Sequence, residues 1–258
     1  MRFLLYNIRY GAGTGTGFHL PFPYSGYLKP TNGNFDNISN FICAMQPDIV
    51  GLVEVDAGTF RTEKRNQAED IAKILCHRHV YSPKYAKNSI AFRFPLLNKQ
   101  GNALLTNRNI LERRFHYLNN GVKRLVIEIE LEEFHLFLVH LALKYGPRQH
   151  QLNELAEIVA SRQKPVVVAG DFNVFRGVSE LDAFCRRTRL MNADGYGRPS
   201  HPSKSPFRQL DHILHSPEIR TTGFVAPHVT YSDHIPLIWD FSLVPVSIQP
   251  DEPLAAAG

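Results

Sequence analysis

The chain has 258 residues, and its 29 Lys and Arg against 24 Asp and Glu give a formal net charge of +5 at pH 7. The apolar fraction is 43% and the charged fraction 21%, values typical of a globular protein. No run of about 18 apolar residues occurs, so we expect no transmembrane helix. The mild basic excess suits a phosphorylated or polyanionic substrate, but it is also found in proteins that bind nothing acidic.

Signals for export and for disulfide bonding are missing as well. The stretch Met1–Tyr10 has a short apolar run and then turns polar, which is typical of a first strand rather than a signal peptide. Cys43, Cys76 and Cys185 lie far apart and are odd in number, so we expect free thiols, no disulfide framework and no cysteine zinc site. These features predict a cytoplasmic location, and they indicate no particular protein partner.

Strands and helices mix along the whole chain. Apolar runs and alternating patterns predict strands, in chain order, at Met1–Ile8, Pro47–Val55, Ser89–Phe94, Asn102–Thr106, Lys123–Leu131, Phe134–Leu141, Pro165–Ala169, 210–215 and 234–241. Apolar residues at helical spacing predict helices at Phe35–Met45, Asn66–Leu75, Arg148–Ser161 and Val178–Thr188. The pair joined at Glu132 and Glu133 is expected to form an antiparallel hairpin.

The order of these elements favours one domain of mixed α/β type. No internal repeat and no linker separates two cores, so we predict a single domain over residues 1–244, with largely antiparallel or mixed sheets covered by helices. Residues 245–258 are predicted to be a flexible tail. The glycine-rich stretch Gly11–Gly17 is not followed by a helix, so we interpret it as a loop beside a site rather than as a dinucleotide fingerprint.

Several apolar strands end in polar residues of the kinds that carry out catalysis. Asp171 and Asn173, at positions i and i+2 of an extended segment, are expected to point into one place. A single such strand end is usually just a strand meeting solvent, but several of them suggest a site on loops held by a rigid sheet. The polar residues at these strand ends are Asn7, Arg9, Glu54, His140, Asp171, Asn173, Asp211, His212, Asp233 and His234.

The motifs NIR, PDIVGLVEV, GNALLT, VHL, GDFN, LDHIL and SDHIPL follow one another over Met1–Phe241. In this order and spacing they resemble the endonuclease/exonuclease/phosphatase superfamily, which has the fold of deoxyribonuclease I. The resemblance implies a four-layered α/β sandwich, with two packed mixed β-sheets flanked by helices. It also implies a Mg²⁺-dependent phosphoester hydrolase, with Mn²⁺ as a substitute, whose site lies across the top of the two sheets.

The resemblance assigns metal and substrate contacts to residues near the strand ends. Glu54 matches the family's strand glutamate and is the first metal ligand, with Asp233 and Asn7 as further ligands. Mg²⁺ prefers such oxygen ligands. Asn7, Arg9 and Asn102 are expected to contact the substrate.

The resemblance also assigns catalytic roles. Asp171 would orient the attacking water and accept its proton, and Asn173 would donate an N–H to a phosphate oxygen. His234, paired with Asp211, would contact the phosphate or act as the base; the sequence leaves open whether Asp171 or His234 is the base. His140 would contact the phosphate or assist the leaving group.

The sequence indicates the type of reaction more clearly than the substrate. A phosphodiesterase or nuclease is favoured, with nucleic acid as one candidate substrate; the alternative is a phosphatase or phospholipase C-like hydrolase of inositol phosphates, sphingomyelin-like lipids or nucleotides. A non-catalytic binding module is a third, less favoured hypothesis. The sequence leaves open the polarity of cleavage, the number of metals and the oligomeric state. Candidate rim residues are Arg61, Lys64, Arg65, Lys84, Lys87, Arg93, Arg113, Arg114, Lys204, Phe18, Phe22, Tyr24 and Tyr27.

Overall fold

The computed structural model describes residues 1–15, 30–84 and 97–243, which contain two six-stranded sheets. The first sheet consists, in spatial order, of β11 (Ile219–Val225), β12 (Leu237–Leu243), β1 (Arg2–Asn7), β2 (Ile49–Asp56), β4 (Gln100–Thr106) and β3 (Arg78–Pro83). The second consists of β5 (Glu112–Tyr117), β6 (Leu125–Glu130), β7 (His135–His140), β8 (Val166–Asp171), β10 (Asp211–His215) and β9 (Met191–Asn192). Each sheet is mixed, because β1 and β2, and likewise β7 and β8, run parallel while the other pairs are antiparallel.

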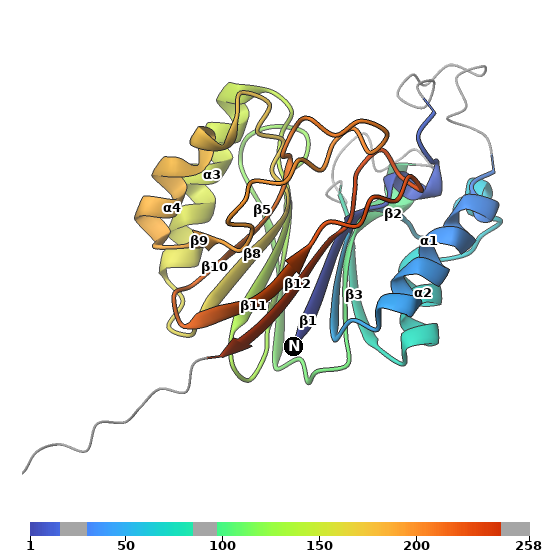
Figure 1. The fold of residues 1–258 in the computed structure, drawn as a ribbon, viewed down its shortest axis with the longest axis horizontal. Coiled ribbons are helices and arrows are strands. Elements are labelled where there is room, and N and C mark those ends of the chain that lie inside the picture. The colour runs from blue at the N-terminus through green and yellow to red at the C-terminus, as the bar shows by residue number, and fades with distance from the viewer. Residues whose placement is uncertain (16–29, 85–96, 244–258) are drawn as a thin grey trace, which may run out of the picture.

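Helices cover the outer face of each sheet (Figure 1). The first sheet carries α1 (Asn32–Met45) and α2 (Gln67–Leu75), and the second carries α3 (Tyr145–Ala160) and α4 (Asp182–Thr188). The predicted four-layered α/β sandwich is therefore confirmed. No helix in the described residues is long and apolar enough to cross a membrane.

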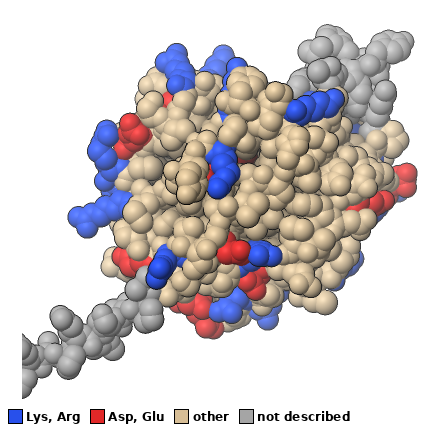
Figure 2. Space-filling view, viewed as in Figure 1, with Lys and Arg blue, Asp and Glu red and all other residues tan. Residues whose placement is uncertain are grey.

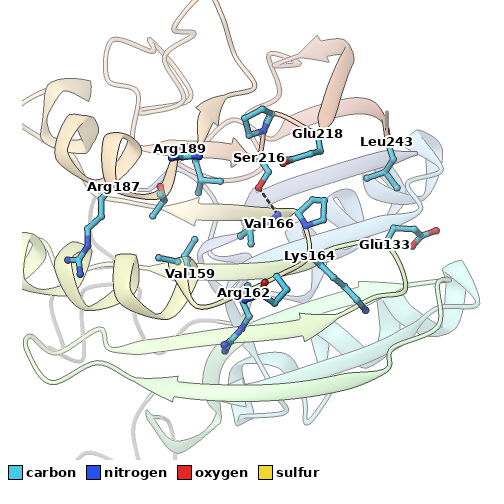
Figure 3. Close-up of a pocket in the computed structure, with 16 residues that line it drawn as sticks. Glu133, Val159, Arg162, Lys164, Val166, Arg187, Arg189, Ser216, Glu218 and Leu243 are labelled. Carbon is cyan, nitrogen blue, oxygen red and sulfur yellow. Dashed lines mark hydrogen bonds between the residues drawn. The ribbon is translucent and has the colours of Figure 1, made fainter. Parts of the chain in front are cut away.

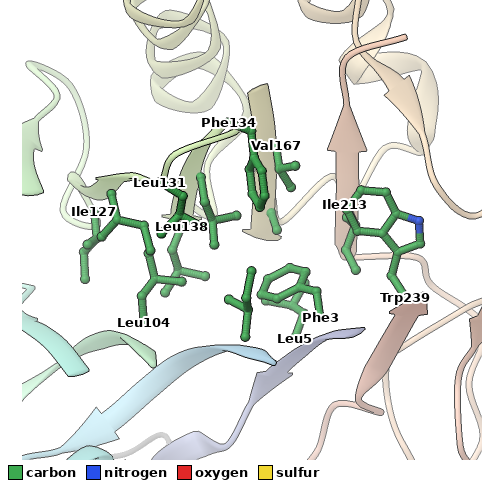
Figure 4. Close-up of a cluster of buried hydrophobic side chains, with 14 of the residues drawn as sticks. Phe3, Leu5, Leu104, Ile127, Leu131, Phe134, Leu138, Val167, Ile213 and Trp239 are labelled. Carbon is green, nitrogen blue, oxygen red and sulfur yellow. The ribbon is translucent and has the colours of Figure 1, made fainter. Parts of the chain in front are cut away.

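The main core lies between the two sheets. Successive side chains of a strand point to opposite faces, so Phe3 and Leu5 of β1 face the other sheet while Leu4 and Tyr6 face the helices. Figure 4 shows Phe3 and Leu5 close to Leu138 of β7 in this core. Burial of each such side chain stabilises the fold by about 1.5–3 kcal/mol, so the spacing of the two sheets is strongly fixed.

Most predicted elements are present, with boundaries shifted by a few residues. The predicted helix Val178–Thr188 is wrong as one helix: Val178–Leu181 is a 3-10 turn that brings Glu180 to within 2.6 Å of Arg148, and α4 follows it. The strands β3, β5, β9 and β11 were not predicted. In β5 every side chain is exposed or only half-buried, so its sequence lacks an apolar pattern.

Some predictions concern residues outside the described ranges. They are the strand Ser89–Phe94, most of the loop after Gly11, and the tail 245–258. The assignment of residues 1–244 to one domain stays a prediction.

A buried carboxylate ties three strands of the second sheet to the end of α3. Glu128 of β6 is fully buried, and it accepts hydrogen bonds from His116 at 2.7 Å and from Arg162 at 2.6 Å. Arg114 at 3.1 Å and His135 at 3.0 Å complete the cluster. Burial alone would raise the pKa of Glu128, but the hydrogen bonds from His116 and Arg162 outweigh it and hold this pKa well below its ordinary value.

Glu128→Gln is expected to lower the free energy of unfolding by about 3 kcal/mol at pH 7, because it leaves the surrounding cations without their counter-charge. Since the folded pKa lies below the unfolded one, this contribution is complete above about pH 4.3 and is lost as the pH falls further. Urea unfolding at pH 7 and pH 3.5 measures both effects. Glu130→Gln, which removes a partly exposed pair with Lys164, is the control and should cost under about 1 kcal/mol. An equal decrease in the free energy of unfolding for the two variants would contradict this role of Glu128.

Candidate active site

Strand register brings three predicted residues into one row. In the parallel pair β7–β8 His140 lies opposite Asp171, and in the antiparallel pair β8–β10 Asp211 lies opposite Asp171. From the other sheet, Asn7 at the end of β1 donates a hydrogen bond from Nδ2 to Asp171 Oδ2 at 3.2 Å. The row therefore joins both sheets at the carboxyl end of β1, which is the end of the molecule opposite the N-terminus in Figure 1.

A cleft of about 390 Å³ opens at this row. Among the predicted catalytic, metal and substrate residues, Asn7, Glu54, Asp171, Asn173, Asp233 and His234 line it, whereas His140, Asp211, Arg9 and Asn102 are not among its lining residues. The full lining is Asn7, Tyr10, Glu54, Lys84, Leu97, Gln100, Lys123, Leu143, Asp171, Asn173, Phe175, His201, Leu210, Asp233 and His234.

Glu54 is directed by a β-bulge. The pairing of β2 with β4 shifts register between Leu52 and Val55, and Glu54 has a φ of 57°. Such bulges re-aim a side chain at the edge of a site. Asn102 Oδ1 accepts a hydrogen bond from the Glu54 backbone N–H at 3.2 Å, and Asn102 is almost fully buried. Asn102 thus orients the Glu54 backbone, and its predicted contact with the substrate stays a prediction.

The turn after β8 is fixed by backbone constraints. Gly170 has a φ of 149°, and a Cβ there would lie 2.0 Å from the Val139 carbonyl oxygen. Asp171 Oδ1 accepts the Asn173 N–H at 3.0 Å, and Asn173 adopts a left-handed φ of 53° that Asn tolerates better than most residues. Asn173 Nδ2 donates to the Leu141 carbonyl at 3.0 Å, so one of its two amide hydrogens remains for a ligand.

His234 is held as part of an acid–imidazole pair. Its Nδ1 lies 2.6 Å from Asp211 Oδ2, which also accepts the Ser200 hydroxyl at 2.6 Å. Its Nε2 points toward Asp171 Oδ2 at 4.0 Å. Burial alone would lower the pKa of His234, but the negative charges of Asp211, Asp171 and Asp233 raise it to about 10. The ring is therefore an imidazolium at neutral pH.

The pKa of His140 is shifted in the opposite direction to that of His234. Its Nε2 lies 3.3 Å from Asp171 Oδ2 and contacts Lys123 Nζ. Burial, followed by the charge of Lys123, lowers the pKa of His140. Burial would raise the pKa of Asp171, but His140 and His234 outweigh it and hold that pKa well below its ordinary value. Asp171 is thus a buried carboxylate next to two imidazoles.

Some residues of the cleft were not predicted from the sequence. Lys123 Nζ lies 3.6 Å from Glu54 Oε1, and its only sequence signal is a position at the start of a predicted strand. Lys84, predicted as a rim residue, lines the cleft and donates to the Tyr10 hydroxyl at 2.8 Å. The His201 ring lies 4.8 Å from the ring of His234. His201 comes from a long loop, where no periodic pattern marks it.

Two predicted basic contacts are placed elsewhere. Arg9 is 2% exposed, and it donates to the Gly13 carbonyl at 2.8 Å and lies 3.3 Å from Asp233, so it supports Asp233; its contact with the substrate stays a prediction. Arg61, predicted at the rim, is fully buried and pairs with Asp56 at 3.0 Å. The predicted rim residues Phe18, Phe22, Tyr24, Tyr27, Lys87 and Arg93 lie outside the described residues.

The oxygen-rich side of the cleft fits a divalent cation. Within the described residues the Glu54 carboxylate accepts no hydrogen bond and has only Lys123 and His140 near it, at 3.6 and 3.8 Å. Burial alone would raise the pKa of Glu54, but the charge of Lys123, followed by the nearby His140 and Lys84, holds this pKa below its ordinary value. An ionised, mostly buried carboxylate of this kind is a suitable ligand for Mg²⁺.

A second group could also hold a metal. Ligand atoms of His201, Asp233 and His234 lie within 4.8 Å of one another. However, Nδ1 of His234 is hydrogen-bonded to Asp211 Oδ2 at 2.6 Å, and its Nε2 is directed toward Asp171 Oδ2 at 4.0 Å, so both ring nitrogens already face carboxylates. Glu54, with Asp233 and Asn7 in the same cleft, therefore fits better than the histidine pair.

A larger cleft, of about 780 Å³, lies between the start of β8 and the end of β12 (Figure 3). Its lining includes Arg162 and Lys164, which are bound to Glu128 and Glu130. It contains no histidine, so it lacks the acid–imidazole arrangement of the smaller cleft.

The layers and the cleft define an α/β sandwich with an acid–imidazole site at one end of its two sheets. The chain belongs to the Endonuclease/Exonuclease/phosphatase family, since the model of that family matches residues 4–234. The members of this family are hydrolases that act on phosphoesters. No curated protein sequence matched the chain.

Solved structures share the fold. An endonuclease/exonuclease/phosphatase from Beutenbergia cavernae has a TM-score of 0.72 at 17% identity, covering 96% of this chain and 73% of that one. A mannosyl-6-phosphatase from Bacteroides thetaiotaomicron has a TM-score of 0.66 at 15% identity, covering 94% and 100%. The catalytic domain of human Nocturnin, with bound sulfate, has a TM-score of 0.64 at 21% identity, covering 94% and 93%.

Gly170→Ala is expected to lower the free energy of unfolding by at least about 3 kcal/mol. The alanine would strain the backbone at this positive φ, and its Cβ would overlap with the backbone of Val139. The control is Gly195→Ala, where a Cβ would meet nothing within 4 Å. Thermal and urea unfolding of both variants measure the difference. If Gly170→Ala were as stable as Gly195→Ala, the tight approach of β7 and β8 at the site would be refuted.

Proposed function

We propose that the protein is a divalent-metal-dependent phosphoester hydrolase that cleaves phosphodiesters by attack of water on phosphorus. The observation that carries this proposal is the Asp171 carboxylate, which contacts Asn7 and His140 and faces His234, in a cleft that also contains Glu54. Membership of a family of phosphoester hydrolases supports the same class of reaction.

Glu54 would hold the cation, with Asp233 and Asn7 as candidates for further contacts. Mg²⁺ is the expected ion, and Mn²⁺ a substitute, because the available donors are mainly oxygens. A bound cation of this kind offsets the negative charge of the phosphate oxygens and orients the ester.

The charge states favour Asp171 over His234 as the acceptor of the water proton. The Asp171 carboxylate is ionised and can orient a water molecule, whereas the pKa of about 10 leaves His234 without a free lone pair. His234 would instead donate from Nε2 to a non-bridging phosphate oxygen. Lys123 and the second amide hydrogen of Asn173 would stabilise the same developing charge, since both residues line the cleft.

The surface charge gives limited support for an extended nucleic-acid track. Figure 2 shows Lys and Arg side chains interspersed with Asp and Glu on the face in view, without a continuous basic area. Contacts to a polyanion on this face would therefore be few. The cytoplasmic location stays a prediction.

Asp171→Asn is expected to lower kcat/KM for bis-p-nitrophenyl phosphate by about a thousandfold, because a general base and its charge are lost while the shape is kept. The control is Asp36→Asn, which changes a carboxylate that is 55% exposed and has no proposed role in the site. Initial rates with Mg²⁺ give the comparison, and circular dichroism checks the fold. Retention of more than a tenth of the activity by Asp171→Asn would exclude Asp171 as the base.

Chelation of the metal is expected to abolish hydrolysis, and Mg²⁺ or Mn²⁺ should restore it in the wild-type chain. Glu54→Gln should need a higher metal concentration, by about tenfold to a hundredfold, because it removes the anionic ligand. Titration of activity against free Mg²⁺ measures this shift. Full activity in EDTA would rule out metal dependence, and cleavage of p-nitrophenyl phosphate alone would indicate a phosphatase of small phosphoesters instead.

A further inference from the structure

A layer of exposed aromatic rings and guanidinium groups extends from one wall of the cleft. We call it the stacked surface and define it by Tyr145, Phe175, Arg176, Phe207 and Arg208. The rings are 41%, 40% and 66% exposed for Tyr145, Phe175 and Phe207. Arg208 Cζ lies 5.5 Å from the ring centroid of Phe175 and 4.7 Å from that of Phe207, so it stands against both. Arg176 Cζ lies 4.0 Å from the ring centroid of Tyr145.

The stacked surface is tied to the catalytic residues through the backbone. Phe175 lines the cleft, and its N–H donates to the Asn173 carbonyl at 2.8 Å. Arg208 and His201 exchange backbone hydrogen bonds of 2.9 and 3.0 Å, and the His201 ring lies 4.8 Å from that of His234. The rings are therefore held at a fixed place next to the expected position of the scissile phosphate.

The two guanidinium groups have hydrogen-bonding capacity left. Within the part of the chain that the structure describes, neither Arg176 nor Arg208 forms an ion pair or a side-chain hydrogen bond. Arg148, which also lies near Tyr145, is by contrast paired with Glu180 at 2.6 Å. Exposed rings beside uncompensated planar cations suit a ligand that combines a flat aromatic group with an anionic group.

We propose that the stacked surface binds a nucleotide of a single-stranded nucleic-acid substrate, adjacent to the phosphate that is cleaved. The base would stack on Phe175 and Phe207, and Arg176 and Arg208 would contact the neighbouring phosphate. This inference rests on the proposed function and adds the substrate class. A lipid surface is disfavoured, because Arg208 is stacked against the Phe175 and Phe207 rings, and inserting these rings into hydrocarbon would bring its charge out of water.

Binding is tested with a single-stranded oligonucleotide that carries 2-aminopurine, whose fluorescence falls when the base stacks. Titrations are done in EDTA with the Asp171→Asn chain, so that no turnover occurs. Phe207→Ala and Phe175→Ala in that chain should each weaken binding by about tenfold and reduce the quenching. Phe207→Leu should resemble Phe207→Ala, because it keeps apolar area but removes the π face. The matched control is Phe115→Ala on β5, which changes a ring that is also 40% exposed, and it should leave binding unchanged.

Each outcome bears on a different claim. Equal binding by the Phe207→Ala, Phe207→Leu and Phe115→Ala chains would overturn the proposal. Binding to anionic phospholipid vesicles that depends on Phe207, without oligonucleotide binding, would overturn it too and assign the surface to a lipid. If the wild-type chain cleaves bis-p-nitrophenyl phosphate but does not bind the oligonucleotide, the proposed function stands and the substrate class is wrong. If it binds through the rings but cleaves no diester, the stacked surface is supported and the proposed function fails.

Discussion

The hydrogen bond from Asn7 to Asp171 is the contact on which the site depends, because it links one sheet to the other. The two atoms lie 3.2 Å apart and both residues are buried. Such a contact requires a constant distance between the sheets, which the core around Phe3, Leu5 and Leu138 provides. A close-packed interior transmits changes over short distances, so this core also sets the geometry of the site. The core between the two sheets therefore determines both the stability of the fold and the geometry of the site.

The site balances negative and positive charge at short range. Glu54 and Asp171 remain ionised although they are mostly buried, because Lys123, His140 and His234 surround them. The cost of burying such charges is large unless they are paired. Glu54 and Asn173 have left-handed backbone conformations, which direct the Glu54 side chain and fix the turn after Asp171. Strain of this kind is often stored at functional sites, where it fixes side chains before a ligand arrives.

The sequence predicted best what local periodicity determines. Strand alternation placed His140, Asp171 and Asp211 at strand ends, and pairing register aligned them. The substrate contacts of Arg9 and Asn102 stay predictions; a strand-end position did not reveal that both side chains are buried and contact Asp233 and the Glu54 backbone. The stacked surface was missed, since Phe175 and Phe207 meet through Arg208 only in three dimensions. Strands β5 and β11 escaped prediction because their edge positions carry little apolar pattern.

The most direct measurement is a double-mutant cycle on diester hydrolysis with Asn7→Ala and Asp171→Asn. If Asn7 acts mainly by holding Asp171 across the two sheets, most of the effect of its loss should disappear once the carboxylate is gone. We predict a large drop in kcat/KM for each single variant, and a double variant whose loss is far smaller than the product of the two single losses. Independent, additive losses would contradict this role, because Asn7 would then act only through contacts other than the one with Asp171.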